Sequence, residues 1–110
     1  MSEATVMVQR SEAGVTLFVS GDLSARTVND FVQTARDLIS PEDRSIDVDL
    51  AGVTLIDSSG TGALARVLDR ANEIGASMRI SRPRRSAHRA IVASGVDRIM
   101  QVGSPYEPSD

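Results

Sequence analysis

The residues best placed to do chemistry are the hydroxyl side chains of the segment 57–62 (DSSGTG), which lies between an apolar strand and an apolar helix. At such a turn the first backbone N–H groups of the helix lack partners, and negative charge is stabilised. A serine here has two interpretations: it caps the helix, or it accepts a phosphate without disrupting the fold. The choice between these interpretations decides the function.

The composition of the segment favours the second interpretation. Capping needs one hydroxyl, whereas the segment offers Ser58, Ser59 and Thr61. Gly60 and Gly62 each cost about 1 kcal/mol of helix propensity in the first turn. That cost is easier to understand if another protein must approach the serine closely. The residues therefore predict a modified or partner-binding serine.

Known catalytic and metal sites fit the sequence poorly. The segment 57–62 is not the G-x-S-x-G elbow of hydrolases, and the sole histidine, His88, lies at the start of an arginine-rich helix. The absence of cysteine excludes thiolate metal sites, and no cluster of carboxylates replaces them. We expect no catalytic residue, no metal site and no cofactor.

A dinucleotide site is the weaker alternative, because residues 60–65 match the fingerprint G-x-G-x-x-A. Three features argue against it. The chain is too short for the usual two-half nucleotide fold, and the strand ending at 80–82 brings no acidic residue for a ribose. The apolar lead before the motif, 55–56, is also short.

Length and charge restrict the remaining classes. A chain of 110 residues suits one domain. A net charge of −3 and only three aromatic residues argue against binding to nucleic acid. No apolar run reaches the roughly 18 residues of a membrane span, and residues 1–10 lack a signal-peptide pattern. We therefore expect a cytoplasmic protein that binds neither nucleic acid nor a membrane.

The charges are unevenly distributed along the chain. Residues 1–57 carry ten acidic and four basic side chains, whereas residues 76–98 carry six arginines and one aspartate. This asymmetry suggests a protein partner with its own charge pattern. The alternative is that these arginines only balance the negative charge of the first half. It applies to Arg82, Arg84, Arg85 and Arg89.

Hydrophobic periodicity predicts the secondary structure. Alternation with a period of two predicts strands at 6–8, 15–19, 46–50, 78–80 and 99–102. Helical spacing predicts helices from about 25 to 39 with Ser24 or Thr27 as the cap, from the serine segment to 74, and from Pro83 to 94. Gly75 and Gly95 fit left-handed C-caps of the last two helices.

Strands that alternate with helices indicate right-handed crossovers and parallel pairing. The expected fold is a single α/β domain with a mixed, mostly parallel sheet of four to five strands. An antiparallel hairpin starts the sheet, and three to four helices flank it. We expect the domain to span residues 1–103 and residues 104–110 to form a flexible tail.

In this setting the chain resembles STAS domains, specifically the single-domain bacterial anti-sigma factor antagonists. Residues 21–23 are similar to the G-x-L turn of that family, and residues 56–60 (IDSSG), preceded by 49–50 and Val53, are similar to its central D-S-S-G segment. Pro83 and residues 94–96 resemble its last helix and the glycine that ends it. The resemblance covers about residues 5–102.

The resemblance implies that Ser58 is phosphorylated by a partner that is both anti-sigma factor and serine kinase, with Ser59 as the fallback acceptor. The unphosphorylated antagonist binds this partner and frees the sigma factor, and a metal-dependent serine/threonine phosphatase removes the phosphate. ATP and Mg²⁺ then belong to the kinase. This chain is a substrate and ligand, not an enzyme.

The expected partner-binding residues surround this serine: Asp22, Ser24, Asp57, Ser59, Gly60, Thr61, Gly62, Arg66 and Asp69. Ser24 and Thr61 depart from the family pattern, which often has Asp after G-x-L and an apolar residue after S-S-G. The alternative for the exposed helix face is a solvated surface with weak i,i+3 and i,i+4 pairs. The alternative function is a STAS scaffold or accessory subunit of a larger complex, stressosome-like or lipid-transporting.

Overall fold

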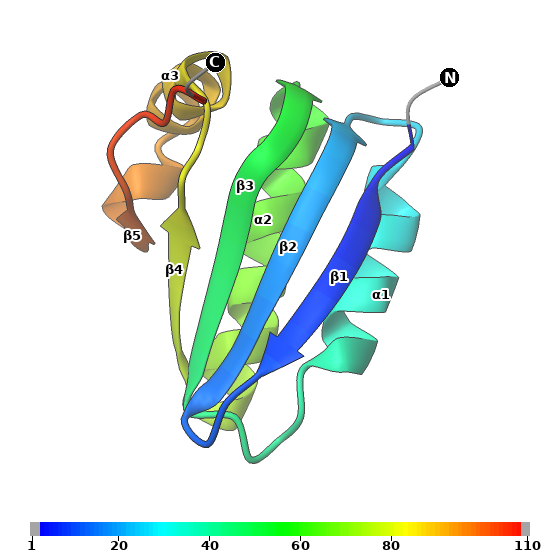
Figure 1. Cartoon of the computed structure of the whole chain (residues 1–110), viewed down its shortest axis with the longest axis vertical. Helices are drawn as coiled ribbons and strands as arrows, with labels where there is room; N and C mark the ends of the chain where they lie inside the picture. Colours follow the sequence, from blue (N-terminus) through cyan, green and yellow to red (C-terminus); the bar gives the residue numbers. More distant parts are fainter. Residues whose placement is uncertain (1–2, 109–110) are drawn as a thin grey trace.

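The computed structural model describes residues 3–108, in which five strands form one sheet in the order β1-β2-β3-β4-β5 (Figure 1). The first two strands pair antiparallel, and each later neighbour pairs parallel. The predicted α/β class, N-terminal hairpin and mixed sheet are therefore confirmed. The strands are β1 (Thr5–Arg10), β2 (Gly14–Leu23), β3 (Ser45–Ile56), β4 (Ser77–Ser81) and β5 (Gln101–Val102).

Three α-helices and one 3₁₀ helix flank this sheet. They are α1 (Val28–Leu38), α2 (Ser58–Ile74), α3 (Arg85–Ser94) and the 3₁₀ helix η1 (Val96–Arg98). Helices α1 and α2 cover the same face of the sheet, and α3 lies beyond the carboxyl end of β4 (Figure 1). Gly75 (φ 74°) and Gly95 (φ 85°) end α2 and α3 in the left-handed conformation that the sequence predicts. Within residues 3–108 no helix is long and apolar enough to cross a membrane.

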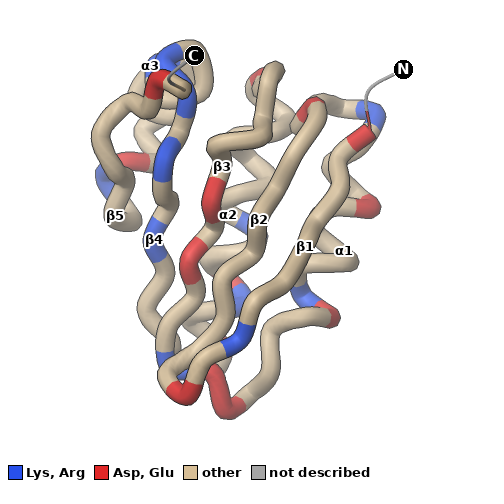
Figure 2. Tube along the Cα trace, in the orientation of Figure 1, with Lys and Arg blue, Asp and Glu red and all other residues tan. Residues whose placement is uncertain are grey.

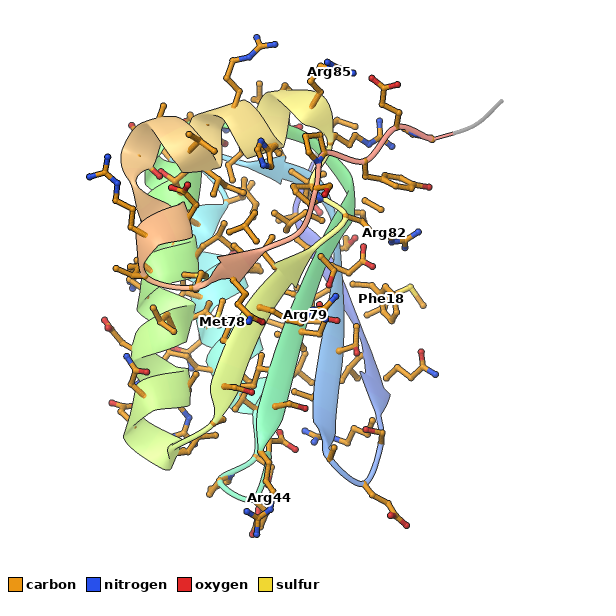
Figure 3. The ribbon with its side chains drawn as sticks, turned by 90° about the vertical axis from the view of Figure 1, so that its left-hand side faces the viewer. Phe18, Arg44, Met78, Arg79, Arg82 and Arg85 are labelled. Atoms are coloured by element: carbon orange, nitrogen blue, oxygen red, sulfur yellow. The ribbon has the colours of Figure 1, made fainter. Side chains whose placement is uncertain are left out.

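The hydrophobic core lies between the sheet and the two helices α1 and α2. Leu17, Val48 and Ile80 point into it from three neighbouring strands, and Phe31 and Leu64 meet them from α1 and α2. Each of these side chains is at most 2% exposed. Buried and more exposed residues alternate along the strands, which gives the sheet one apolar face. The packing of α2 against this face fixes the position of the helix. Figure 3 shows the division: Met78 points toward the helices, and Phe18 points to the opposite side.

The face of the sheet opposite α1 and α2 carries paired charges. Acidic residues on β3 lie beside basic residues on β4 (Figure 2). Arg79 lies 3.5 Å from Asp47, and Arg82 Nε donates to Asp49 Oδ2 at 2.8 Å. The hydrogen bond from Arg82 to Asp49, together with the charge of that carboxylate, raises the pKa of Arg82. Of the four arginines considered in the alternative interpretation, Arg82 pairs with an acidic residue of the first half, whereas Arg85 pairs with Glu107 near the end of the chain.

Strand β3 is longer than the sequence predicts, because it joins the expected strand 46–50 to the apolar lead 55–56. Gly52 lies within this strand. A Cβ at Gly52 would come within 2.7 Å of Ser20 Cβ, and the register of β2 and β3 shifts between Phe18 and Ser20. The glycine therefore permits a close approach of two strands at an irregularity.

Helix α1 begins at Val28, about three residues later than predicted. The hydroxyl of Thr27 donates to the carbonyl oxygen of Asp22 at 2.7 Å and accepts from the N–H of Ser24 at 3.1 Å. These bonds hold residues 22–27 in a turn rather than a helix. Thr27 occupies the N-cap position, as one of the two predicted caps, but its side chain makes no capping hydrogen bond.

The end of the chain runs beside the segment that follows β4. Strand β5 is shorter than predicted, because η1 precedes it. The N–H of Gly103 donates to Ile80 O at 2.8 Å, and the N–H of Tyr106 donates to Pro83 O at 2.7 Å. The guanidinium of Arg82 lies 5.0 Å from the centre of the Tyr106 ring. Flexibility of residues 104–110 stays a prediction, and residues 109–110 lie outside the described part.

Candidate functional site

The serine segment lies where β3 ends and α2 begins, and the end of β2 lies directly beside it. Leu23 pairs with Ile56 across the two strands, and the N–H of Asp57 donates to Leu23 O at 3.2 Å. Residues 21–23, expected as a turn, are the last residues of β2, and the structure brings them together with the segment 57–62 at the carboxyl edge of the sheet. These are the two motifs on which the resemblance depends.

Asp57, not Ser58, caps α2. Its Oδ1 accepts from the N–H of Gly60 at 3.0 Å, and its backbone oxygen accepts from the N–H of Thr61 at 3.0 Å. The backbone of Asp57 is extended (φ −113°, ψ −170°), as expected for an N-cap, and Ser58 is the first helical residue. The interpretation of Ser58 as a plain N-cap is therefore wrong, because the carboxylate of Asp57, one residue earlier, makes the capping hydrogen bond.

The three hydroxyls of the segment differ in how far a second protein can reach them. Ser58 is exposed and Ser59 is half-buried. Thr61 is only 3% exposed, and its Oγ1 donates to Ser58 O at 3.0 Å. Ser58 thus presents its hydroxyl to solvent at a helix N-terminus, whereas Thr61 uses its hydroxyl within the fold.

The two glycines of the segment differ in the space around them. A Cβ at Gly60 would lie 2.3 Å from Leu23 O and 2.6 Å from Ile56 Cγ1. Gly60 is therefore required by the packing of α2 against β2 and β3, without any partner. A Cβ at Gly62 would meet nothing within 4 Å, and Gly62 is exposed. An open surface for a partner therefore exists at Gly62 but not at Gly60.

Asp22 and Ser24 lie next to the serine segment and are half-buried. The hydroxyl of Thr54 donates to Asp22 Oδ1 at 3.2 Å, which orients the carboxylate along the edge of the sheet. Both residues line a hollow of about 370 Å³, together with Asp30 and Leu55. Leu55 is 52% exposed and was not among the predicted site residues, because the sequence placed it only in the short apolar lead before the serine segment.

The predicted face of α2 carries Arg66 and Asp69, which are both exposed. Arg66 Nη1 donates to Asn29 Oδ1 of α1 at 3.4 Å, a weak contact. Further along the helix, Glu73 lies 3.6 Å from Arg70 and 3.1 Å from Arg36. Exposed pairs of this kind contribute little stability, so this face is free to be covered by a partner.

The described chain offers no obvious place for a metal. Within residues 3–108 no three or more histidine, aspartate or glutamate side chains are grouped to hold one. His88 lies in α3, outside the serine segment. The segment places the hydroxyl of Ser58 at a helix N-terminus, where the helix dipole and the first N–H groups of a helix stabilise negative charge.

The fold and the site together define a single α/β domain that presents a serine at the start of its second helix. The family model STAS_2, described as "Mlab, STAS domain", matches residues 6–102. The chain therefore belongs to the STAS domain family. A comparison with curated protein sequences found no match.

Solved structures with the same fold include two anti-sigma factor antagonists. One, from Mycobacterium paratuberculosis, is 21% identical with a TM-score of 0.75, over 96% of this chain and 86% of that chain. The other is SpoIIAA in its unphosphorylated form, 13% identical with a TM-score of 0.68, over 91% of this chain and 89% of that chain. At these identities the likeness shows the fold alone.

The fold also occurs within a much larger protein. The murine anion transporter Slc26a9 is 16% identical with a TM-score of 0.71, over 97% of this chain. The match spans only 21% of the transporter chain. The fold thus makes up most of some solved chains and a small part of another.

The assignment of the cap predicts different stabilities for two neighbouring variants. Asp57→Ala removes the acceptor for the N–H of Gly60, so it should lower the free energy of unfolding by about 1 kcal/mol. Ser58→Ala should change it by no more than about 0.5 kcal/mol, as for other exposed positions. Urea unfolding followed by circular dichroism measures both. A larger loss for Ser58→Ala than for Asp57→Ala would contradict the assignment.

The two glycines provide a second matched pair. Gly60→Ala should destabilise the fold by about 1–3 kcal/mol, because the new methyl group overlaps Leu23 and Ile56. Gly62→Ala should be neutral or stabilise it by up to about 1 kcal/mol, because the methyl group meets open space and alanine favours the helix. Thermal unfolding of the two variants compares them. Equal stability of the two variants would show that the packing of α2 against β2 and β3 does not require a glycine at position 60.

Proposed function

We propose that this chain is an anti-sigma factor antagonist whose activity is switched at Ser58. In its unphosphorylated form it binds an anti-sigma factor that is also a serine kinase, and the sigma factor is released. Phosphorylation of Ser58 by that kinase then prevents binding. The observation that carries the proposal is an exposed serine in a chain of the STAS family. Because Asp57 caps α2, the hydroxyl of this serine is not needed as the cap.

The position of Ser58 suits a phosphate that changes binding without changing the fold. A phosphate adds about 1.5 to 2 negative charges and three acceptor oxygens. At the first turn of α2 these oxygens meet N–H groups that have no partner within the helix. The scaffold is therefore expected to stay folded, while its surface changes in charge and in bulk.

The effect on the partner is repulsive. Asp57 already places one carboxylate beside Ser58, so a phosphate would concentrate negative charge at the centre of the interface. A loss of about 3 kcal/mol in binding free energy weakens the affinity about a hundredfold. That change is sufficient for a switch, and it requires no rearrangement of the sheet or the helices.

The remaining components of the switch belong to the partners. The kinase supplies ATP and Mg²⁺, and a metal-dependent serine/threonine phosphatase restores the unmodified serine. This chain is the ligand and the substrate in both reactions and is not an enzyme. Because the kinase uses ATP, we place the proposed cycle in the bacterial cytoplasm.

The second candidate is a permanent subunit of a larger complex. The occurrence of the fold within the Slc26a9 transporter supports it, since there the domain is one part of a larger chain. In that case the chain would form a stable stoichiometric complex, and Ser58 would not need to be phosphorylated. The two candidates therefore differ in the modification of one hydroxyl.

The proposal predicts a single phosphorylated position. The cognate kinase should transfer one phosphate to the wild-type chain and to Ser59→Ala, and none to Ser58→Ala. Intact mass spectrometry counts the phosphates, and peptide mapping locates them. The Ser59→Ala control shows that removal of a neighbouring hydroxyl does not itself block the kinase.

Two results would overturn this prediction. Phosphorylation of a folded Ser58→Ala variant would move the acceptor to another residue. Stable co-purification of the wild-type chain in a large complex, without any phosphate, would favour the subunit alternative.

A further inference from the structure

A shallow groove borders Ser58 and is distinct from the hollow lined by Asp22. Its volume is about 380 Å³, and no charged residue lines it. One wall belongs to the first turns of α2, and the other to the last residue of α3 and the segment that follows it. The lining residues are Ser58, Thr61, Gly62, Ala65, Ser94, Gly95, Val96 and Ile99.

Local backbone features create this groove. Gly95, in the left-handed conformation, ends α3 and turns the chain into η1, which lies next to α2 (Figure 3). Val96 packs into the core and is 5% exposed, whereas Ile99 stays 58% exposed at the rim. On the opposite wall Gly62 has no side chain to fill the space. The result is an apolar hollow with a large aliphatic side chain at its edge.

We propose that this groove receives an apolar side chain of the anti-sigma factor/serine kinase, and that Ile99 determines specificity for that partner. The inference rests on the proposed function and deepens it. A kinase that reaches Ser58 Oγ must cover the surface around it, and Ser58 itself forms part of the groove wall. The side chain that fits is apolar, because the groove offers no charged group to pair with.

The groove also explains how one phosphate could abolish binding. A phosphate on Ser58 would place its oxygens at the wall of an apolar hollow. A partner side chain that enters the hollow would then remove water from the phosphate without supplying hydrogen bonds in return, which is unfavourable. The kinase therefore docks in the groove only while Ser58 is unmodified, and a phosphate once present on Ser58 opposes renewed docking.

The test is a pair of charge-introducing variants on exposed aliphatic residues. Ile99→Asp places a carboxylate in the groove; Val92→Asp places one on α3, outside the groove, at a residue that is 46% exposed. The probes are the purified anti-sigma factor/serine kinases encoded in the same genome. Calorimetry measures the affinity of each for the unphosphorylated wild-type chain and for both variants, and circular dichroism checks the folds.

Ile99→Asp should weaken binding by at least about tenfold, whereas Val92→Asp should stay within about twofold of the wild type. Ile99→Ala, which adds no charge, should show an intermediate loss and serves if the aspartate variant does not fold. If the wild type binds and Ile99→Asp and Ile99→Ala bind equally well, the groove is not the docking site. Equal weakening by Ile99→Asp and Val92→Asp would overturn the inference as well. If the wild type binds none of these kinases, the proposed function itself fails.

Discussion

The hydrogen bond from the N–H of Gly60 to the carboxylate of Asp57 is the interaction on which the site depends. Because the side chain of Asp57 caps the helix by accepting from the N–H of Gly60, the hydroxyl of Ser58 at the first helical position is not needed as the cap. The close approach of Gly60 to Leu23 then holds this turn against the end of β2. The cap by Asp57 and the contact between Gly60 and Leu23 together fix the position of Ser58. This position therefore does not depend on the hydroxyl group of Ser58.

This arrangement separates stability from signalling. The residues that hold the turn, Asp57, Gly60 and Thr61, bond or pack within the chain. Ser58, Gly62 and Ile99 face outward around one apolar groove. A modification at Ser58 can therefore change what the surface accepts while the scaffold persists, which is the physical requirement for the proposed switch. Gly60 and Thr61, expected at first to meet a partner, are placed to support the turn.

Much of the fold could be predicted because its signals are local. Gly75 and Gly95 end helices in the left-handed conformation, which glycine adopts readily, so the residue type alone predicts these ends. Alternation of apolar and polar residues predicted the strands around Val48 and Leu17. Features that depend on tertiary contacts could not be predicted. The length of β3 depends on the approach of Gly52 to β2, and the groove at Ile99 depends on the packing of η1 beside α2. The choice of cap among consecutive polar residues also required the structure, because residues 57–59 all have suitable side chains.

The most direct test of the proposed switch compares two forms of the wild-type chain that differ by one phosphate. The anti-sigma factor/serine kinase is titrated calorimetrically with the unmodified chain and with the chain phosphorylated stoichiometrically at Ser58. We predict an affinity about a hundredfold lower for the phosphorylated chain, with unchanged far-ultraviolet circular dichroism. Equal affinity of the two forms would contradict the account.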